Sequence, residues 1–276
     1  MVKFSEFDMT GRFVLITGAA GLLGQHHCEA ILESGATVIA TDINLNHLKD
    51  LKETNKFKKY DKRFVVKKLN VVDEDEIIEL KDELLLEKMM PCTLVNNAAL
   101  NPTVSKNGKI ANGRLEEFDE LSFTKEIEVG LKGYILCCKI FAEEMQKKKF
   151  GNIINIASDL AVIAPSQFLY QKKNEQSILA NKKPVSYSAI KHAVIGLTKY
   201  MATYYCDSGI RCNALSPGGV KVNQDKEFIA KIETLIPLGR MANPDEYKGA
   251  IKYLCSDASL YLNGHNLVVD GGRSVW

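Results

Sequence analysis

The stretch Arg12-Phe-Val-Leu-Ile-Thr-Gly-Ala-Ala-Gly-Leu-Leu-Gly24 decides the predicted fold, because its short apolar strand ends in a glycine-rich turn that opens a helix. Helix-forming residues continue to position 34, and Gly35 ends them. A second apolar strand follows at residues 36–42. A strand, a helix and another strand in this order predict a parallel βαβ unit.

Strands and helices go on alternating along the chain. Further strands are predicted at residues 63–70, 92–97, 152–157, 210–215 and 266–270, and helices at 46–54, 73–89, 116–148 and 185–207. Apolar strands separated by helices are typical of a parallel sheet covered on both faces. We therefore predict an α/β fold with a Rossmann-like, doubly wound sheet of seven parallel strands, as a single domain over residues 1–276.

The composition argues against several classes of protein. Lys and Arg number 36 against 34 Asp and Glu, for a net charge of +2, so neither a nucleic-acid nor a membrane surface is predicted. The apolar runs fall short of the roughly 18 residues of a membrane span, and the first residues lack a secretory apolar core. The seven cysteines and five histidines show no metal-ligand spacing. We expect a cytoplasmic protein with reduced cysteines, no metal and a small-molecule partner.

The glycine turn and the end of the second strand together indicate a dinucleotide site. Gly18, Gly21 and Gly24 stand where glycines let a pyrophosphate approach main-chain amides at a helix N-terminus. Asp42 ends the second strand, where a carboxylate binds ribose hydroxyls and repels a 2′-phosphate. No arginine stands beside it to neutralise such a phosphate, which favours NAD over NADP. The alternatives are an ordinary tight turn and a helix-capping Asp42.

Tyr187 and Lys191 lie four residues apart in a predicted helix and therefore share one face. A phenol titrates near pH ~10, and a nearby ammonium favours its ionised form, which makes it a usable acid and base. Such a pair is by default a solvated helix face. Here it follows a strand that ends at Ser158, and the carboxyl ends of parallel strands are where ligands bind.

The order of these motifs resembles that of the short-chain dehydrogenase/reductase family over essentially the whole chain. Asn96-Asn-Ala-Ala99 is similar to the family's Asn-Asn-Ala-Gly turn, Gly151-Asn-Ile-Ile-Asn-Ile-Ala-Ser158 to its serine strand, and Tyr187-Ser-Ala-Ile-Lys191 to its signature. Ser216-Pro-Gly218, Pro237-Leu-Gly-Arg240 and Val269-Asp-Gly-Gly272 complete the resemblance downstream.

The resemblance implies hydride transfer between a secondary alcohol or ketone and NAD(H). Tyr187 would exchange the proton, Lys191 would hold the nicotinamide ribose and lower the pKa of the phenol, and Ser158 would orient the reacting oxygen. The resemblance also implies the cofactor contacts. The pyrophosphate would be bound by Gly18, Gly21, Leu23 and Gly24, and the adenine by Asn70 and Val71. The adenosine ribose would be bound by Asn97 and Ala98, and the nicotinamide by Pro217, Gly218 and Val220. Taken alone, Asn97 is equally a turn former and Ser158 a strand-end hydroxyl.

A homodimer or homotetramer is also expected. The predicted helices around residues 131–145 and 189–205 carry more apolar and aromatic positions than one sheet face needs. The family resemblance implies that such helices pair between subunits.

Two features depart from the family pattern. Gly130 stands where the family has an asparagine in the long helix, which puts its proton relay in doubt, although glycine permits a local kink that keeps a main-chain carbonyl available. Between Ser158 and Tyr187 lie 28 residues, an insertion at 159–184 with lysines and aromatic side chains. We expect this insertion to be a mobile lid on the substrate side.

The sequence is compatible with several substrate classes. The insertion resembles that of oxidoreductases of flagellin glycosylation and nonulosonic acid synthesis, which implies a sugar, and its lysines suit a phosphorylated or nucleotide-linked one. Solvated lysines on a surface loop are the alternative. Two alternatives for the whole protein are a reductase of a non-sugar ketone and, because of Gly130, a non-catalytic NAD-binding sensor. Retention of Ser158, Tyr187 and Lys191 together favours catalysis.

Overall fold

A computed structural model describes residues 5–100, 113–171 and 181–276 of the chain. Its strands are β1 (Phe13–Thr17), β2 (Thr37–Asp42), β3 (Phe64–Lys68), β4 (Thr93–Asn96), β5 (Gly151–Ile156), β6 (Ile210–Pro217) and β7 (Asn266–Val269). They form one seven-stranded parallel sheet in the order β3-β2-β1-β4-β5-β6-β7. The α/β, Rossmann-like, single-domain prediction is confirmed.

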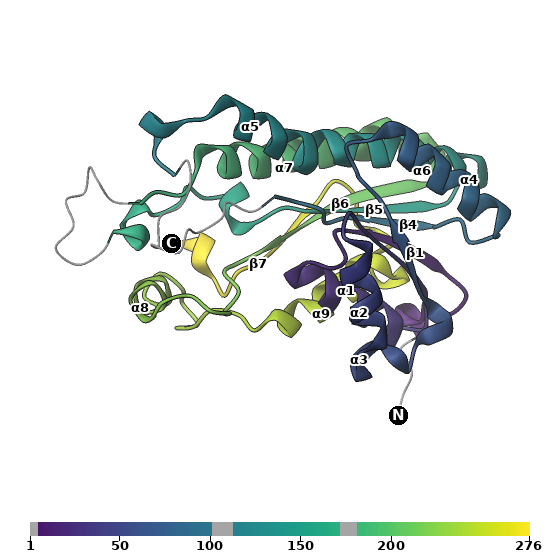
Figure 1. Cartoon of the computed structure of the whole chain (residues 1–276), viewed down its shortest axis with the longest axis horizontal. Helices are drawn as coiled ribbons and strands as arrows, with labels where there is room; N and C mark the ends of the chain where they lie inside the picture. The colour runs from purple at the N-terminus through teal and green to yellow at the C-terminus, as the bar shows by residue number, and fades with distance from the viewer. Residues whose placement is uncertain (1–4, 101–112, 172–180) are drawn as a thin grey trace.

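Helices cover both faces of this sheet (Figure 1). On one face lie α4 (Glu74–Leu86), α5 (Glu120–Ile127), α6 (Gly133–Lys148) and α7 (Val185–Tyr204); on the other lie α1 (Leu22–Glu33), α2 (Leu45–Glu53), α3 (Asn55–Lys58) and α9 (Lys248–Cys255). The remaining α-helix of the described residues, α8 (Lys226–Glu233), lies apart from these two layers, beyond the end of β6.

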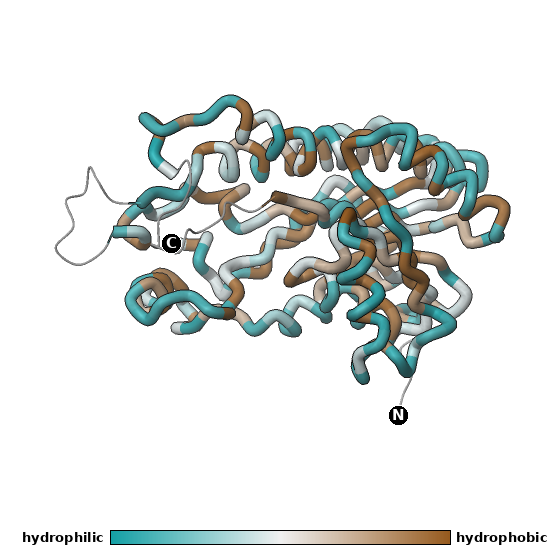
Figure 2. The backbone as a smooth tube through the Cα atoms, viewed as in Figure 1, coloured by the Kyte–Doolittle hydropathy of each residue, from teal (hydrophilic) through white to brown (hydrophobic). Residues whose placement is uncertain are grey.

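Alternation along the strands explains the two layers. In β1, Val14 and Ile16 belong to the apolar core under α1 and α9, whereas Leu15 belongs to the core under α4 and α6. Figure 2 shows the same arrangement, with hydrophobic strands between helices whose hydropathy alternates along their length. Because successive side chains of a strand point to opposite faces, a continuously apolar strand must be covered on both sides.

The predicted elements differ from the observed ones mainly at their ends. Asp73 caps α4, as predicted, by accepting hydrogen bonds from the backbone N–H groups of Asp75 and Glu76. The predicted helix at residues 116–148 begins later, at Glu120, and contains a π-helical turn, η4 (Glu128–Lys132), between α5 and α6. β6 extends two residues beyond its predicted end, to Pro217, and so reaches the predicted nicotinamide segment.

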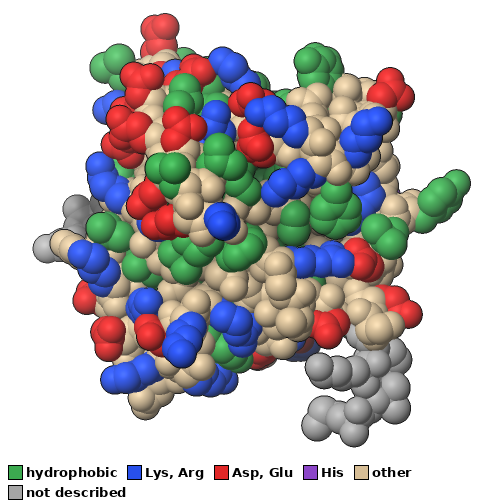
Figure 3. Space-filling view, turned by 90° about the vertical axis from the view of Figure 1, so that its right-hand side faces the viewer, with side chains coloured by type: hydrophobic (Ala, Val, Ile, Leu, Met, Phe, Trp, Pro, Cys, Tyr) green, Lys and Arg blue, Asp and Glu red, His purple; other side chains and the backbone are tan. Residues whose placement is uncertain are grey.

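Within the described ranges, no helix is long and apolar enough to cross a membrane. On the face shown in Figure 3, basic and acidic side chains are interspersed, so neither sign of charge forms a continuous field there. All seven cysteines are free, and five of them are buried. They pack as small apolar side chains.

Candidate active site

A cleft of about 1180 Å³ opens at the carboxyl ends of the strands. Such a volume exceeds the range of roughly 300–1,000 Å³ that is usual for a single small ligand, so a dinucleotide and a small substrate fit together. It is lined by twelve of the fifteen predicted site residues: Gly18, Gly21, Leu23, Gly24, Asp42, Asn97, Ser158, Tyr187, Lys191, Pro217, Gly218 and Val220.

Three predicted cofactor residues are not part of this lining. The backbone N–H of Asn70 donates to Glu76 Oε2 at 2.9 Å, and buried Val71 packs beneath α6, where a Cβ on Gly133 would lie 2.8 Å from Val71 Cγ2. Ala98 lies under the glycine turn instead, and its backbone N–H donates to Thr17 Oγ1 at 3.1 Å. Cofactor contact by these three residues stays a prediction.

The glycine turn between β1 and α1 has no room for side chains. Gly18 has a φ of +61°, and a Cβ there would lie 2.7 Å from Ala98 Cα; a Cβ on Gly24 would lie 2.3 Å from the Gly18 carbonyl oxygen. The Asn97 side chain holds this turn by donating to the carbonyls of Thr17 and Gly18, at 3.0 and 2.9 Å. Asn97 is therefore a turn-forming residue that also lines the cleft.

Gly21 is the N-cap of α1 and offers no side chain to its first N–H groups. These donors face the cleft at the positive end of the helix dipole, which is an arrangement that suits an anionic pyrophosphate.

Asp42 lies at the end of β2, beside this turn. Its Oδ2 accepts from the backbone N–H of Ala20 at 3.1 Å, and its Oδ1 accepts from that of Asn44 at 2.9 Å. Both carboxylate oxygens keep a free lone pair, because an ionised carboxylate offers about four acceptor sites. Asn44, not Asp42, is the N-cap of α2, and the contacts of Asp42 leave its carboxylate able to bind a ribose.

Ser158, Tyr187 and Lys191 meet at the end of β5. The Ser158 and Tyr187 side chains are hydrogen-bonded to each other. Lys191 Nζ donates to the Ile156 carbonyl at 2.9 Å and lies 5.9 Å from the centre of the Tyr187 ring. Only 4% of Ser158 and 6% of Lys191 is exposed. A half-buried phenol at the cleft therefore lies beside a hydroxyl and an ammonium that are closed to water.

One expectation about this group is wrong. We predicted that Lys191 lowers the pKa of Tyr187, but burial raises that pKa, and the hydrogen bond with Ser158 offsets only part of the rise. Burial also lowers the pKa of Lys191 to about 8, and the nearby charge of Lys183 adds to this effect. Removal from water thus sets the direction of both pKa shifts.

Gly130 lies in the π-helical turn η4, so the predicted local distortion of the helix is present. A Cβ at this position would lie 3.0 Å from Ile190 Cγ2 of α7, tighter than ordinary contact. The close approach of η4 to the helix that carries Tyr187 explains in part why this position is a glycine.

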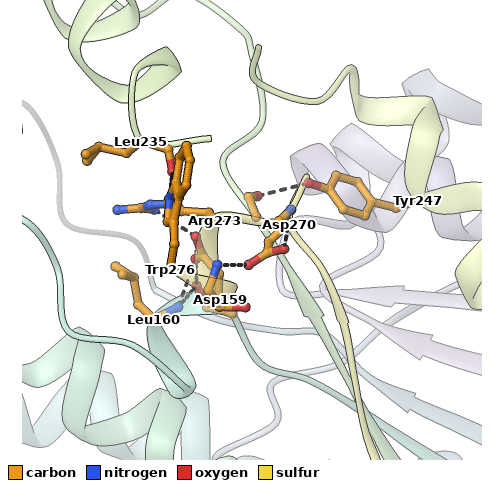
Figure 4. A network of polar contacts seen from close by, with 11 residues as sticks. Asp159, Leu160, Leu235, Tyr247, Asp270, Arg273 and Trp276 are labelled. Carbon is orange, nitrogen blue, oxygen red and sulfur yellow. Dashed lines mark hydrogen bonds and ion pairs between the residues drawn. The ribbon is translucent and has the colours of Figure 1, made fainter. Parts of the chain in front are cut away.

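Two charged side chains that were not predicted complete the serine end of the site (Figure 4). Ser158 Oγ donates to Asp159 Oδ1 at 2.9 Å, and Asp159 Oδ2 accepts from Arg273 at 2.7 Å. Arg273 comes from the C-terminal turn, which Asp270 holds by accepting from the backbone N–H groups of Gly272 and Ser274. Ser158 Oγ also accepts from the backbone N–H of Leu160 at 3.2 Å.

The insertion at 159–184 is anchored to α8 in its described part. Leu169, in the turn η6 (Gln167–Tyr170), packs with Ile232, and the Tyr170 and Phe228 rings lie 5.7 Å apart. Lys231 of α8 donates to the Gln171 carbonyl. Residues 172–180, with Lys172 and Lys173, lie outside the described residues, and the mobile lid stays a prediction.

Sheet order, helical layers and the cleft at the strand ends define a Rossmann-like α/β protein. Residues 18–274 match the family described as enoyl-(acyl carrier protein) reductase. The chain belongs to the short-chain dehydrogenase/reductase family and is an oxidoreductase.

Two curated relatives align over nearly their whole length. The chain is 31% identical to 2-dehydro-3-deoxy-D-gluconate 5-dehydrogenase of Bacillus subtilis over 272 residues, covering 96% of each protein. It is 29% identical to post-translational flagellin modification protein A of Campylobacter coli over 266 residues, covering 96% of this chain and 98% of the relative.

Solved structures show the same fold. A short-chain dehydrogenase from Leptospira borgpetersenii with bound NAD+ has a TM-score of 0.82 at 28% identity, covering 99% of this chain and 97% of that one. A gluconate 5-dehydrogenase from Burkholderia cenocepacia in complex with NADP and tartrate has a TM-score of 0.83 at 26% identity, covering 98% of each. Both nicotinamide cofactors therefore occur among structures similar to this chain.

Proposed function

We propose that this protein is an NAD(H)-dependent oxidoreductase that interconverts a secondary alcohol and a ketone on a sugar or sugar derivative. The observation that carries the proposal is the group of buried Ser158 and Lys191 and half-buried Tyr187 at the end of the cleft. The Bacillus subtilis relative is named for a sugar acid and the Campylobacter coli relative for flagellin modification, which supports a sugar-related substrate.

A bound nicotinamide would supply the hydride acceptor or donor. Tyr187 would exchange the proton of the reacting oxygen, and Ser158, already hydrogen-bonded to the phenol, would orient that oxygen. Lys191, which the Ile156 carbonyl holds below the tyrosine ring, would bind the nicotinamide ribose. Because burial keeps the phenol protonated at neutral pH, ketone reduction is favoured there and alcohol oxidation speeds up as the pH rises.

The substrate class is tested by following NADH absorbance with a panel of sugar alcohols, sugar acids, sugar phosphates and nucleotide sugars. Turnover of any sugar-derived ketone or alcohol supports the proposal. Turnover confined to non-sugar ketones favours the general reductase, and NADH binding without any turnover favours the sensor.

Cofactor choice depends on Asp42 in this proposal. We expect NADH to bind at least about tenfold more tightly than NADPH, because the Asp42 carboxylate repels a 2′-phosphate and Ala20 and Ile43 carry no neutralising charge. Asp42→Ala should narrow the gap. Calorimetric titration with both cofactors measures the two affinities. Asp61→Ala, which removes an exposed carboxylate in the turn before β3, is the control. Equal or tighter binding of NADPH by the wild type would contradict the assignment.

We also propose a homodimer or homotetramer that forms through α6 and α7. Four large apolar or aromatic side chains on these helices are exposed: Ile135 by 41%, Val185 by 47%, Tyr200 by 59% and Tyr204 by 63%. Light scattering at micromolar concentration should give at least twice the mass of the chain, and the double variant Tyr200→Glu/Tyr204→Glu should lower it. Tyr261→Glu changes a fully exposed tyrosine outside α6 and α7 and should leave the mass unchanged. A monomeric wild type would refute the proposal.

A further inference from the structure

Lys183 occupies a distinctive place beside the candidate catalytic phenol. It is the last residue but one of the insertion and lies four residues before Tyr187, and its backbone N–H donates to Gln167 Oε1 at 2.8 Å. Its Nζ lies 3.7 Å from the centre of the Tyr187 ring, closer than the Lys191 Nζ, and the residue lines the cleft. The anchoring by Gln167 and the start of α7 therefore place an ammonium at the substrate end of the cleft.

This ammonium has no anionic partner among the residues that the structure describes, and neither has Lys191, which instead donates to the Ile156 carbonyl; the two other cations that line the cleft are paired. Arg273 is paired with Asp159, and Lys231 is paired with Glu227 at 2.8 Å and donates to the Gln171 carbonyl. Burial lowers the pKa of Lys183 to about 8 despite the more distant charges of Asp159 and Glu126. A cation that is withdrawn from water without a counterion is costly, and a bound anion would remove that cost.

We propose that Lys183 binds the carboxylate of the substrate and that the substrate is consequently a sugar acid. The inference rests on the proposed function and narrows its substrate class. Among the described residues that line the cleft, Lys183 is the one cation left for the substrate: Asp159 neutralises Arg273, Glu227 neutralises Lys231, and Lys191, which donates to the Ile156 carbonyl, is assigned to the nicotinamide ribose. One charge matches a carboxylate, whereas a phosphate monoester carries about −1.5 to −2 near neutral pH. The position of Lys183 against the Tyr187 ring places that carboxylate a few bonds from the reacting carbon.

The test compares Lys183→Met with Lys182→Met on matched substrates. Lys182 is the adjacent lysine of the same segment, but its charge acts on Glu116 and it does not line the cleft. The substrates are sugar alcohols, the sugar acids of the same carbon number and the corresponding sugar phosphates, with saturating NAD+. We expect Lys183→Met to lower kcat/KM for the acids by about tenfold to hundredfold, chiefly through KM, and to leave the neutral alcohols within about threefold. Lys182→Met should behave as the wild type.

Several results would overturn the inference. If the wild type has a higher kcat/KM for the sugar phosphates or the neutral alcohols than for the sugar acids, Lys183 does not bind a substrate carboxylate. An equal loss on acids and alcohols through kcat would show that Lys183 tunes Tyr187 instead of binding an anion. NADH affinity, measured by calorimetry, must stay unchanged in the variant for the comparison to count, and it serves as the check on folding.

Failure of the proposed function is distinguished by direct binding. If the wild type turns over none of these compounds, the proposed reaction fails, and the sugar acids are then titrated into the NADH complex. Tighter acid binding by the wild type than by Lys183→Met supports the anion site without turnover. Equal binding by the two proteins overturns it.

Discussion

Replacing Tyr187 with phenylalanine should lower kcat by roughly 10²- to 10⁴-fold while leaving the affinity for NADH nearly unchanged. The variant removes only the hydroxyl that is hydrogen-bonded to Ser158 and keeps the ring on which the Lys183 ammonium lies. Packing at the start of α7 is thus preserved, and the loss reports on proton exchange. Steady-state kinetics on a verified substrate and calorimetric titration with NADH measure the two quantities.

Tyr134 provides a matched control for this variant. Its hydroxyl is also buried at the end of β5 and donates to the Ile156 carbonyl at 3.2 Å, but the residue does not line the cleft. Tyr134→Phe removes a buried hydroxyl of the same kind and should keep kcat within a few-fold. If Tyr187→Phe retained a large share of the wild-type kcat, Tyr187 would not be the acid and base, and the non-catalytic reading would gain support.

The fold follows from local features of the sequence. Continuous apolar runs such as the one at Val14 to Ile16 leave no polar face to solvent, and the glycines after each of several strands mark the turns at one edge of the sheet. The site follows for the same reason, because Gly18 comes directly after β1, Ser158 comes two residues after β5, and Pro217 ends β6. Parallel strands bring such positions together whatever their separation in the chain.

What the sequence does not reveal are pairings that depend on side-chain direction across the fold. Arg273 follows two glycines in a C-terminal turn, and nothing local indicates that it reaches Asp159, 114 residues earlier. The sequence offers one signal for Arg273. It is a basic residue that directly follows Gly271 and Gly272, just after the predicted last strand. The raised pKa of Tyr187 likewise depends on burial by distant segments, whereas the sequence shows only the nearby lysine.

The pair of Asp159 and Arg273 leads to a large expected effect on stability. Their side chains are only 5% and 7% exposed, and they are joined by an ion pair of 2.7 Å. Arg273→Met should lower the free energy of unfolding by about 3–5 kcal/mol, because it leaves the Asp159 carboxylate buried without a counter-charge. Chemical denaturation followed by circular dichroism measures the change. Arg240→Met is the control, since the ion pair of Arg240 with Glu246 is exposed and its loss should change stability little.

The double variant Asp159→Asn/Arg273→Met separates the loss of the pair from the cost of the stranded charge. Asparagine keeps an acceptor for Ser158 and for the Leu160 N–H but carries no charge, so the double variant should recover much of the stability that Arg273→Met loses. Additive losses in the two single variants would show that the residues are not coupled. The activity of the double variant need not recover with its stability, because Ser158 is hydrogen-bonded to Asp159 itself. A double variant that is stable but has a low kcat would show that Asp159 and Arg273 position the serine.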